Sequence, residues 1–124
     1  MIRGIGVDIV DIGRVRKLIE TEEMRFLEKV FTRTEIAYCN AKHNRYQHFA
    51  ARFAAKEAVS KALATGWAGD FRWKHVEVTN DASGQPRISV YGRIKEHLGS
   101  SHILISLSHA DAYVVAMAVI EDPR

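Results

Sequence analysis

The chain has 124 residues, of which 47% are hydrophobic and 27% charged, a balance that is typical of a globular protein and excludes a disordered one. Its 18 Lys and Arg against 15 Asp and Glu give a net charge of +3, a mild surplus that suits either a solvated surface or an acidic partner. The length fits one domain, residues 1–124, and excludes a nucleotide-binding domain joined to a separate substrate domain. We therefore expect a large substrate to be held at the surface or between subunits.

The cysteine content and the N-terminal sequence both favour a reducing compartment. The single cysteine, Cys39, excludes an intramolecular disulfide framework. No apolar run approaches the roughly 20 residues that span a bilayer. Asp8 and Asp11 interrupt the apolar N-terminal stretch, which is therefore unlike a signal peptide. The sequence predicts a cytoplasmic protein without a membrane segment.

The first half of the chain carries the signals of one strand followed by helices. The segment Ile2–Val10 is apolar and β-branched, which indicates a buried strand. Asp11 can cap a helix whose apolar positions continue to Ile19, and residues 32–35 have the form of a capping box. The predicted helices are one that follows Asp11, one over Glu22–Val30, a short one from the capping box through Cys39, and a long one over Tyr46–Thr65.

The long helix predicted over Tyr46–Thr65 is apolar nearly all round, which is typical of a central, buried helix. Gly66 would end it. Small residues on one side would allow another element to approach closely. The larger apolar residues of one side are Phe49, Phe53, Val59 and Leu63, and the small residues of the opposite side are Ala51, Ala55, Ala58 and Ala62.

Alternating apolar residues and turn signals dominate the second half of the chain. This order predicts an α+β fold, in which the N-terminal strand and the helices pack on an antiparallel sheet. Turn signals at residues 81–84 and 109–112 would join strands into hairpins. The predicted elements are strands over Trp73–Thr79, Arg87–Tyr91, Ile103–Ser108 and Tyr113–Ile120 and a short helix over Gly92–Leu98.

Four charged residues interrupt the long helix. Burying an unpaired charge is costly, so each of them needs a partner, a metal or a ligand. In a structural interpretation, the long stems reach the surface and Glu57 pairs with Lys61 at the i,i+4 spacing. In a functional interpretation, the charges form a binding site. Taken alone, the spacing favours the structural interpretation. The four residues are Arg52, Lys56, Glu57 and Lys61.

Asp8 poses a similar question, because it interrupts the apolar run of the first strand. It could be a strand-end carboxylate exposed to water, or a second cap for the next helix. Alternatively, it could meet Glu57 in space. Two carboxylates without a His/Cys cluster suit Mg²⁺, which takes oxygen ligands and is often held by one or two carboxylates and substrate phosphates.

Other motifs are weaker. Residues 4–6 lack the third glycine of a dinucleotide fingerprint, since Ile9 takes that place. Cys39, His43 and His48 make three zinc ligands at best. A Ser–His dyad at Ser106-Leu107-Ser108-His109 is less favoured than a polar strand end, because neighbours in sequence rarely have dyad geometry. The mixed charges also disfavour a nucleic-acid-binding module, which usually interleaves basic and aromatic residues.

The segments 4–10 and 52–62, together with Arg14, resemble the holo-[acyl-carrier-protein] synthases, the short AcpS-type 4′-phosphopantetheinyl transferases. The resemblance continues in residues 75–78, 84–87 and 106–109 and so covers nearly the whole chain. It implies transfer of 4′-phosphopantetheine from coenzyme A to a serine of apo-acyl carrier protein, with release of adenosine 3′,5′-bisphosphate, in support of fatty acid biosynthesis. One departure is Ala64, where the family commonly has glycine.

The resemblance also implies roles for individual residues. Asp8 and Glu57 would bind the required Mg²⁺, and Glu57 would act as the base, directly or through a metal-bound water. Lys61 would contact the coenzyme A phosphates and take part in catalysis. Positions in or beside the coenzyme A pocket would be Arg52, Pro86, Ser108 and His109.

The partners that the resemblance implies are an acidic carrier protein and further copies of the chain. Arg14, with Lys17 and Arg25 on the early helices, would steer and dock the carrier protein. The family forms trimers with active sites at subunit interfaces, which agrees with the expectation that so small a domain does not enclose its substrate alone.

Overall fold

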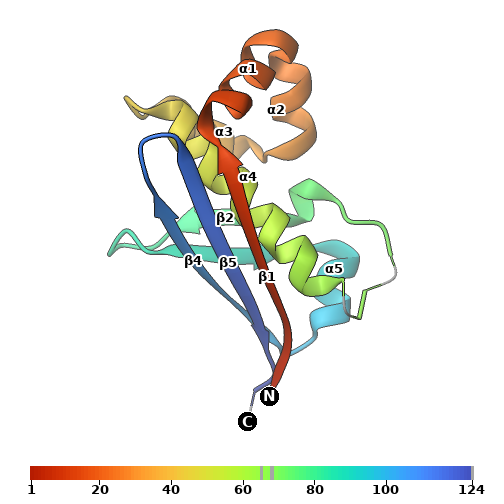
Figure 1. Cartoon of the computed structure of the whole chain (residues 1–124). Helices are drawn as coiled ribbons and strands as arrows, with labels where there is room; N and C mark the ends of the chain where they lie inside the picture. Colours follow the sequence, from red (N-terminus) through yellow and green to blue (C-terminus); the bar gives the residue numbers. More distant parts are fainter. Residues whose placement is uncertain (65, 68, 124) are drawn as a thin grey trace.

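A long helix, α4 (Arg45–Leu63), lies against one face of a three-stranded antiparallel sheet and organises the fold (Figure 1). The computed structural model describes residues 1–64, 66–67 and 69–123. The sheet contains β1 (Ile2–Asp11), β5 (Tyr113–Glu121) and β4 (His102–His109), with β5 in the centre. A second sheet pairs β2 (Val76–Asn80) with β3 (Pro86–Val90). The predicted α+β class is confirmed.

Small residues let α4 approach β1 closely, as predicted. Gly4 and Gly6 of β1 face the backbone carbonyl groups of Ala62 and Ala58. A Cβ atom at either glycine would collide with those carbonyl groups, so glycine is needed for this approach. This close contact holds β1 against α4 next to the polar residues of both elements.

Helix caps confirm two predicted helix starts. α1 (Ile12–Glu22) begins after Asp11, whose carboxylate accepts a hydrogen bond from the backbone N–H of Arg14 at 3.2 Å. The capping box precedes α3 (Arg33–Asn40): the Thr32 N–H donates to Glu35 Oε1 at 2.9 Å, and the Glu35 N–H donates to Thr32 Oγ1 at 3.2 Å.

The helix predicted over Glu22–Val30 begins later than expected. Because α1 continues through Glu22, α2 starts only at Met24 and ends at Val30. Glu23 separates the two helices with a φ of 52°. α4 likewise ends at Leu63 with Ala64 as its C-cap, whereas Thr65 lies outside the described residues.

The strand predicted over Trp73–Thr79 is wrong in its first three residues. Trp73–His75 form a 3₁₀ turn, η1, and β2 starts at Val76. The reason is tertiary: the Trp73 ring stacks on Phe53 of α4, and its carbonyl accepts a hydrogen bond from Lys56. The other elements agree within a residue or two, including the short helix α5 (Gly92–Leu98).

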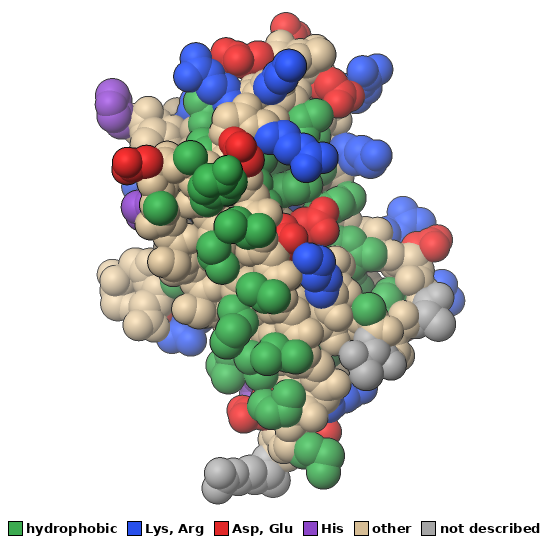
Figure 2. Space-filling model, viewed as in Figure 1, with side chains coloured by type: hydrophobic (Ala, Val, Ile, Leu, Met, Phe, Trp, Pro, Cys, Tyr) green, Lys and Arg blue, Asp and Glu red, His purple; other side chains and the backbone are tan. Residues whose placement is uncertain are grey.

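The outer face of the three-stranded sheet is open. The prediction that β1 is a buried strand is therefore wrong for this face. Ile5, Val7 and Ile9 are 56–63% exposed, whereas the alternate positions face α4. Figure 2 shows hydrophobic side chains gathered over this face. The remaining large apolar residues exposed on it are Leu104, Tyr113, Val115 and Met117.

None of the helices in the described ranges is long and apolar enough to cross a membrane.

Candidate active site

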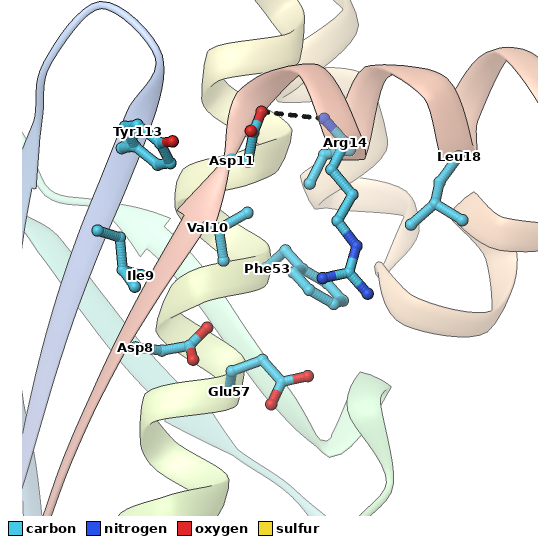
Figure 3. A pocket seen from close by; sticks show the side chains of 10 residues that line it. Asp8, Ile9, Val10, Asp11, Arg14, Leu18, Phe53, Glu57 and Tyr113 are labelled. Atoms are coloured by element: carbon cyan, nitrogen blue, oxygen red, sulfur yellow. Dashed lines mark hydrogen bonds between the residues drawn. The ribbon is translucent and has the colours of Figure 1, made fainter.

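A pocket of about 360 Å³ opens where the end of β1 meets α1 and α4 (Figure 3). Asp8 enters it from β1, Arg14 from α1, and Phe53 and Glu57 from α4. The apolar part of its lining includes Val10, Val15 and Leu18 of the same elements, so the charged groups are partly shielded from water. The structure therefore brings together two carboxylates that are far apart in the sequence.

Local geometry aims Asp8 at α4. From Gly4 to Val10, the even-numbered residues of β1 point to the helix, and Asp8 pairs in the sheet with Ala116, which is fully buried on the same side. The ammonium group of Lys61 donates to Asp8 Oδ1 at 2.9 Å and to the Val7 carbonyl at 3.1 Å. Lys61 therefore bonds to a carboxylate of β1. The structural interpretation had paired it with Glu57 instead.

The pKa values of Glu57 and Lys61 are both raised by their surroundings. Burial raises the pKa of Glu57, and the negative charge of Asp8 raises it further, while Lys61 partly opposes both effects. The pKa of Lys61 is also raised, first by its hydrogen bond to Asp8. The charge of Asp8 therefore acts on Glu57 across the pocket, and both side chains offer carboxylate oxygens on the same side of α4.

The donor set suits a hard divalent cation and not zinc. Within the described ranges, no three or more His, Cys, Asp and Glu residues gather as metal ligands. Cys39, the third candidate in a zinc trio, is fully buried, and burial raises its thiol pKa to about 12. A cation held by Asp8 and Glu57 would take its other oxygen ligands from water or substrate, as Mg²⁺ commonly does.

A second group of predicted site residues gathers elsewhere, near the start of α4. Arg52 is only 3% exposed: one guanidinium N–H donates to Asn80 Oδ1 at 2.9 Å, and the group stacks 4.2 Å over the centroid of the Tyr38 ring. Its Nε atom is buried without a hydrogen-bond partner among the described residues. Burial lowers the pKa of the neighbouring His48, and so do the charges of Arg52, Lys42 and His109.

We call Lys42, His48, Arg52 and His109 the basic cluster. It shares no residue with the lining of the Asp8–Glu57 pocket. Lys42 and His48 were not among the predicted site residues. The one-turn spacing of His48 and Arg52 on α4 is the signal that could have found the histidine.

The remaining predicted residues lie outside both groups. Pro86 begins β3 and lines a groove with residues 103–107 of β4. Ser108 pairs with Val115 and so lies on the open outer face of the sheet, away from α4. Lys17 is exposed on α1, and Arg25 is exposed on α2, where it pairs with Glu22 at 3.2 Å.

The sequence of the chain matches a known family and curated relatives. The family model of the 4′-phosphopantetheinyl transferase superfamily matches residues 4–118. A holo-[acyl-carrier-protein] synthase of Geotalea daltonii is 45% identical, over 98% of this chain and 99% of the relative. A protein of the same name from Chlamydia trachomatis is 46% identical, over 95% of this chain and 98% of the relative.

Solved structures are similar over the same extent. The holo-[acyl-carrier-protein] synthase of Neisseria meningitidis has a TM-score of 0.87 at 31% identity and covers 98% of this chain and 100% of its own. The Helicobacter pylori protein, solved in complex with coenzyme A, has a TM-score of 0.83 at 29% identity and covers 94% of this chain and 99% of its own.

Proposed function

The chain belongs to the 4′-phosphopantetheinyl transferase superfamily and is an enzyme of the holo-[acyl-carrier-protein] synthase type, and we propose that it works through Asp8, Glu57 and Lys61. The reaction moves 4′-phosphopantetheine from coenzyme A to a serine of apo-acyl carrier protein, as the relatives' name implies. The observation that carries the residue assignment is the meeting of these three charged groups beside one pocket.

Asp8 and Glu57 are the proposed ligands of Mg²⁺. Both are oxygen donors, both line the pocket, and their mutual repulsion gives a cation a reason to bind there. When bound, the ion would offset negative charge that grows on the phosphate of the leaving group.

Glu57 is also the proposed base. In the transfer, the serine oxygen forms a bond to the β-phosphate of coenzyme A, and the bond from that phosphorus to adenosine 3′,5′-bisphosphate breaks. The serine proton has to leave, and Glu57 can accept it. Without a bound metal, burial and Asp8 raise the pKa of Glu57, and a base works best when its pKa lies nearer to the operating pH.

Lys61 is the proposed contact to the phosphates of coenzyme A. Its side chain is 53% exposed, so its ammonium group can reach a ligand while Asp8 orients it. A compact positive charge stabilises a developing phosphate anion without moving during the reaction.

The carrier protein would approach from α1 and α2. Arg14 lines the pocket itself, and Lys17 and Arg25 are exposed on the neighbouring helices. Basic residues at the rim of an interface guide an acidic partner and fix its orientation. This arrangement would bring the acceptor serine to the pocket that holds Glu57.

The basic cluster, Pro86 and Ser108 are proposed to bind coenzyme A across a subunit interface in a homotrimer. The open face of the sheet is apolar, which is typical of a surface that another subunit covers. A copy seated there could place its basic cluster beside the Asp8–Glu57 pocket of the neighbour. We place the enzyme in the cytoplasm, in fatty acid biosynthesis.

Intact-mass analysis of apo-acyl carrier protein tests the function. Incubation with the chain, coenzyme A and Mg²⁺ should add the mass of one phosphopantetheinyl group, and a serine-to-alanine carrier protein should gain none. An unchanged mass for the serine form would overturn the proposal.

A further inference from the structure

A fully buried ion pair involves Lys56, the residue of α4 that precedes Glu57. The Lys56 ammonium nitrogen is 2.7 Å from Glu35 Oε1, and both side chains are 0% exposed. Lys56 precedes Glu57 in α4, so the two adjacent residues point to different sides of the helix, one into the core and one into the pocket. The reaction proposed above uses Glu57 and leaves Lys56 without a role.

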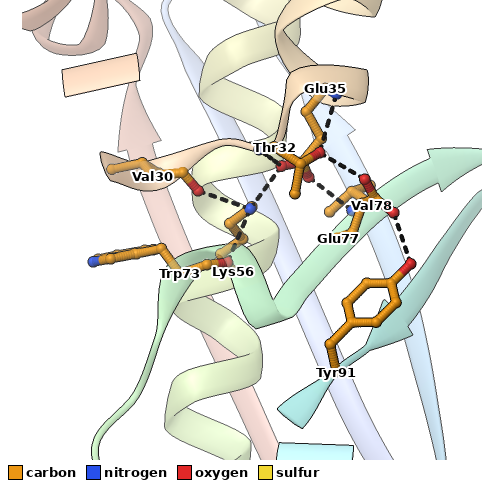
Figure 4. Close-up of polar contacts among 8 residues, drawn as sticks. All are labelled: Val30, Thr32, Glu35, Lys56, Trp73, Glu77, Val78 and Tyr91. Atoms are coloured by element: carbon orange, nitrogen blue, oxygen red, sulfur yellow. Dashed lines mark hydrogen bonds and ion pairs between the residues drawn. The ribbon is translucent and has the colours of Figure 1, made fainter. Parts of the chain in front are cut away.

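Three acceptors from three segments share the Lys56 ammonium group (Figure 4). It donates to the Val30 carbonyl at the end of α2 at 2.8 Å, to Glu35 of α3, and to the Trp73 carbonyl of η1 at 3.0 Å. An ammonium group has three donor hydrogens, so its capacity is fully used. One side chain therefore holds α2, α3 and η1 on a single turn of α4.

The network reaches the pocket through an aromatic stack. The Trp73 ring lies parallel to the Phe53 ring, with centroids 5.3 Å apart and an angle of 15°. Phe53 lines the pocket one helical turn before Glu57. The hydrogen bond from Lys56 thus fixes the backbone of the residue that supports the pocket wall beside Glu57.

Glu35 holds the other side of the same junction. Its second oxygen, Oε2, accepts from the backbone N–H of Val78 in β2 at 2.8 Å, and Oε1 also accepts from the Thr32 N–H. A buried ion pair is weak support for stability alone, since apolar replacements of such pairs are often neutral or stabilising. What an apolar pair would not supply here is the directed bond to Trp73.

We propose that Lys56 is a positioning residue of the transferase: through its hydrogen bond to the Trp73 carbonyl it holds the Trp73 ring against Phe53, which lines the pocket one helical turn before Glu57. This inference rests on the proposed function for its kinetic consequence. The geometric consequence, the position of Trp73, is independent of catalysis.

Two variants separate positioning from stability. Lys56→Met removes all three hydrogen bonds and leaves Glu35 buried without its partner charge, so both the melting temperature and kcat should fall. In Lys56→Met with Glu35→Gln, the unpaired charge is gone and the melting temperature should recover substantially. The Trp73 carbonyl still lacks its donor, so kcat should stay about 10- to 100-fold low, with the KM for coenzyme A unchanged.

Tryptophan fluorescence reports on the surroundings of Trp73 directly. The chain has two tryptophans, Trp67 and Trp73, so a Trp67→Phe background reports Trp73 emission alone. We expect a red shift in Lys56→Met and in the double variant. Ile94→Ala is the matched control, because Ile94 is buried in α5, away from the pocket lining. It should lower the melting temperature but leave Trp73 emission and kcat unchanged at a temperature where every variant is folded.

The outcomes distinguish the two proposals. Recovery of kcat together with the melting temperature in the double variant would overturn the positioning role, and so would unshifted Trp73 emission in both Lys56 variants. Absence of transfer by the unsubstituted chain would instead refute the proposed function, while the emission experiment would still decide the role of Lys56.

Discussion

Two lysines on α4 each form an ion pair with a carboxylate, but the two pairs differ in burial. Lys56 meets Glu35 with both side chains 0% exposed, and Lys61 meets Asp8 with 53% and 17% exposed. Burial lowers the pKa of Lys56, whereas its bond to Asp8 raises the pKa of Lys61. The first pair has no room for a ligand. The second is open to solvent, where a substrate can reach it, so we assign the exposed pair to the proposed active site and the buried pair to the scaffold.

The strongest way to break this comparison is to remove the acids beside the exposed pair. Asp8→Asn or Glu57→Gln should lower turnover by about 100- to 1,000-fold, because each removes a proposed metal ligand and a fixed charge of the proposed active site. Steady-state rates at several Mg²⁺ concentrations give the measurement. Asp11→Asn is the matched control: Asp11 also lines the pocket, but it caps α1, and asparagine caps equally well. Near-normal rates for the Asp8 or Glu57 variant in excess Mg²⁺ would contradict the ligand assignment.

The buried pair should dominate stability. Lys56→Met leaves the Glu35 carboxylate without its partner charge in the core and should lower the free energy of unfolding by about 3–5 kcal/mol. Lys61→Met should change it little, because exposed ion pairs contribute little to folding. Urea denaturation monitored by circular dichroism measures both. Equal losses in the two variants would remove the distinction between the pairs.

The exposed pair should instead govern substrate use. Lys61→Ala should raise the KM for coenzyme A by about tenfold, the usual effect of one lost hydrogen bond to a charged group. Initial rates over a range of coenzyme A concentrations test this, with Lys95→Ala as a control on the exposed surface of α5. An unchanged KM for Lys61→Ala would separate Lys61 from the phosphates.

The smallest expected effect concerns Glu57 and pH. Its pKa is raised by burial and by Asp8, so ionised Glu57 destabilises the fold above its raised pKa. Without divalent cations, Glu57→Gln should therefore melt higher than the unsubstituted chain at neutral pH. The difference should shrink as the pH falls through the raised pKa and vanish below the ordinary glutamate value, where both states are protonated. A difference that persists there would contradict burial as its cause.

Local signals in the sequence were sufficient for most elements. Asp11 and the Thr32–Glu35 capping box each fix a helix start within a few residues, and both predictions hold. The first three residues of the predicted Trp73–Thr79 strand failed, because the Phe53 ring and the Lys56 ammonium group that hold Trp73 come from another element. Tertiary contacts overrode the alternating pattern.

The site shows the same limit. The i,i+4 spacing offered Glu57 as the partner of Lys61, and local spacing could not reveal that Asp8, 53 residues away, lies closer to its ammonium group. The resemblance named Asp8, Glu57 and Lys61 together, and the structure gathers them. It did not name Lys42 and His48 of the basic cluster, which only the fold brings to His109.

Manganese binding followed by electron paramagnetic resonance tests the proposed metal site most directly, with Mn²⁺ standing in for Mg²⁺ and coenzyme A present. The chain should bind one ion beyond those bound by coenzyme A alone, and the Asp8→Asn, Glu57→Gln double variant should leave the free-ion signal at the level of the protein-free coenzyme A sample while keeping its fold. Equal Mn²⁺ uptake by the double variant would show that these two carboxylates do not hold the ion.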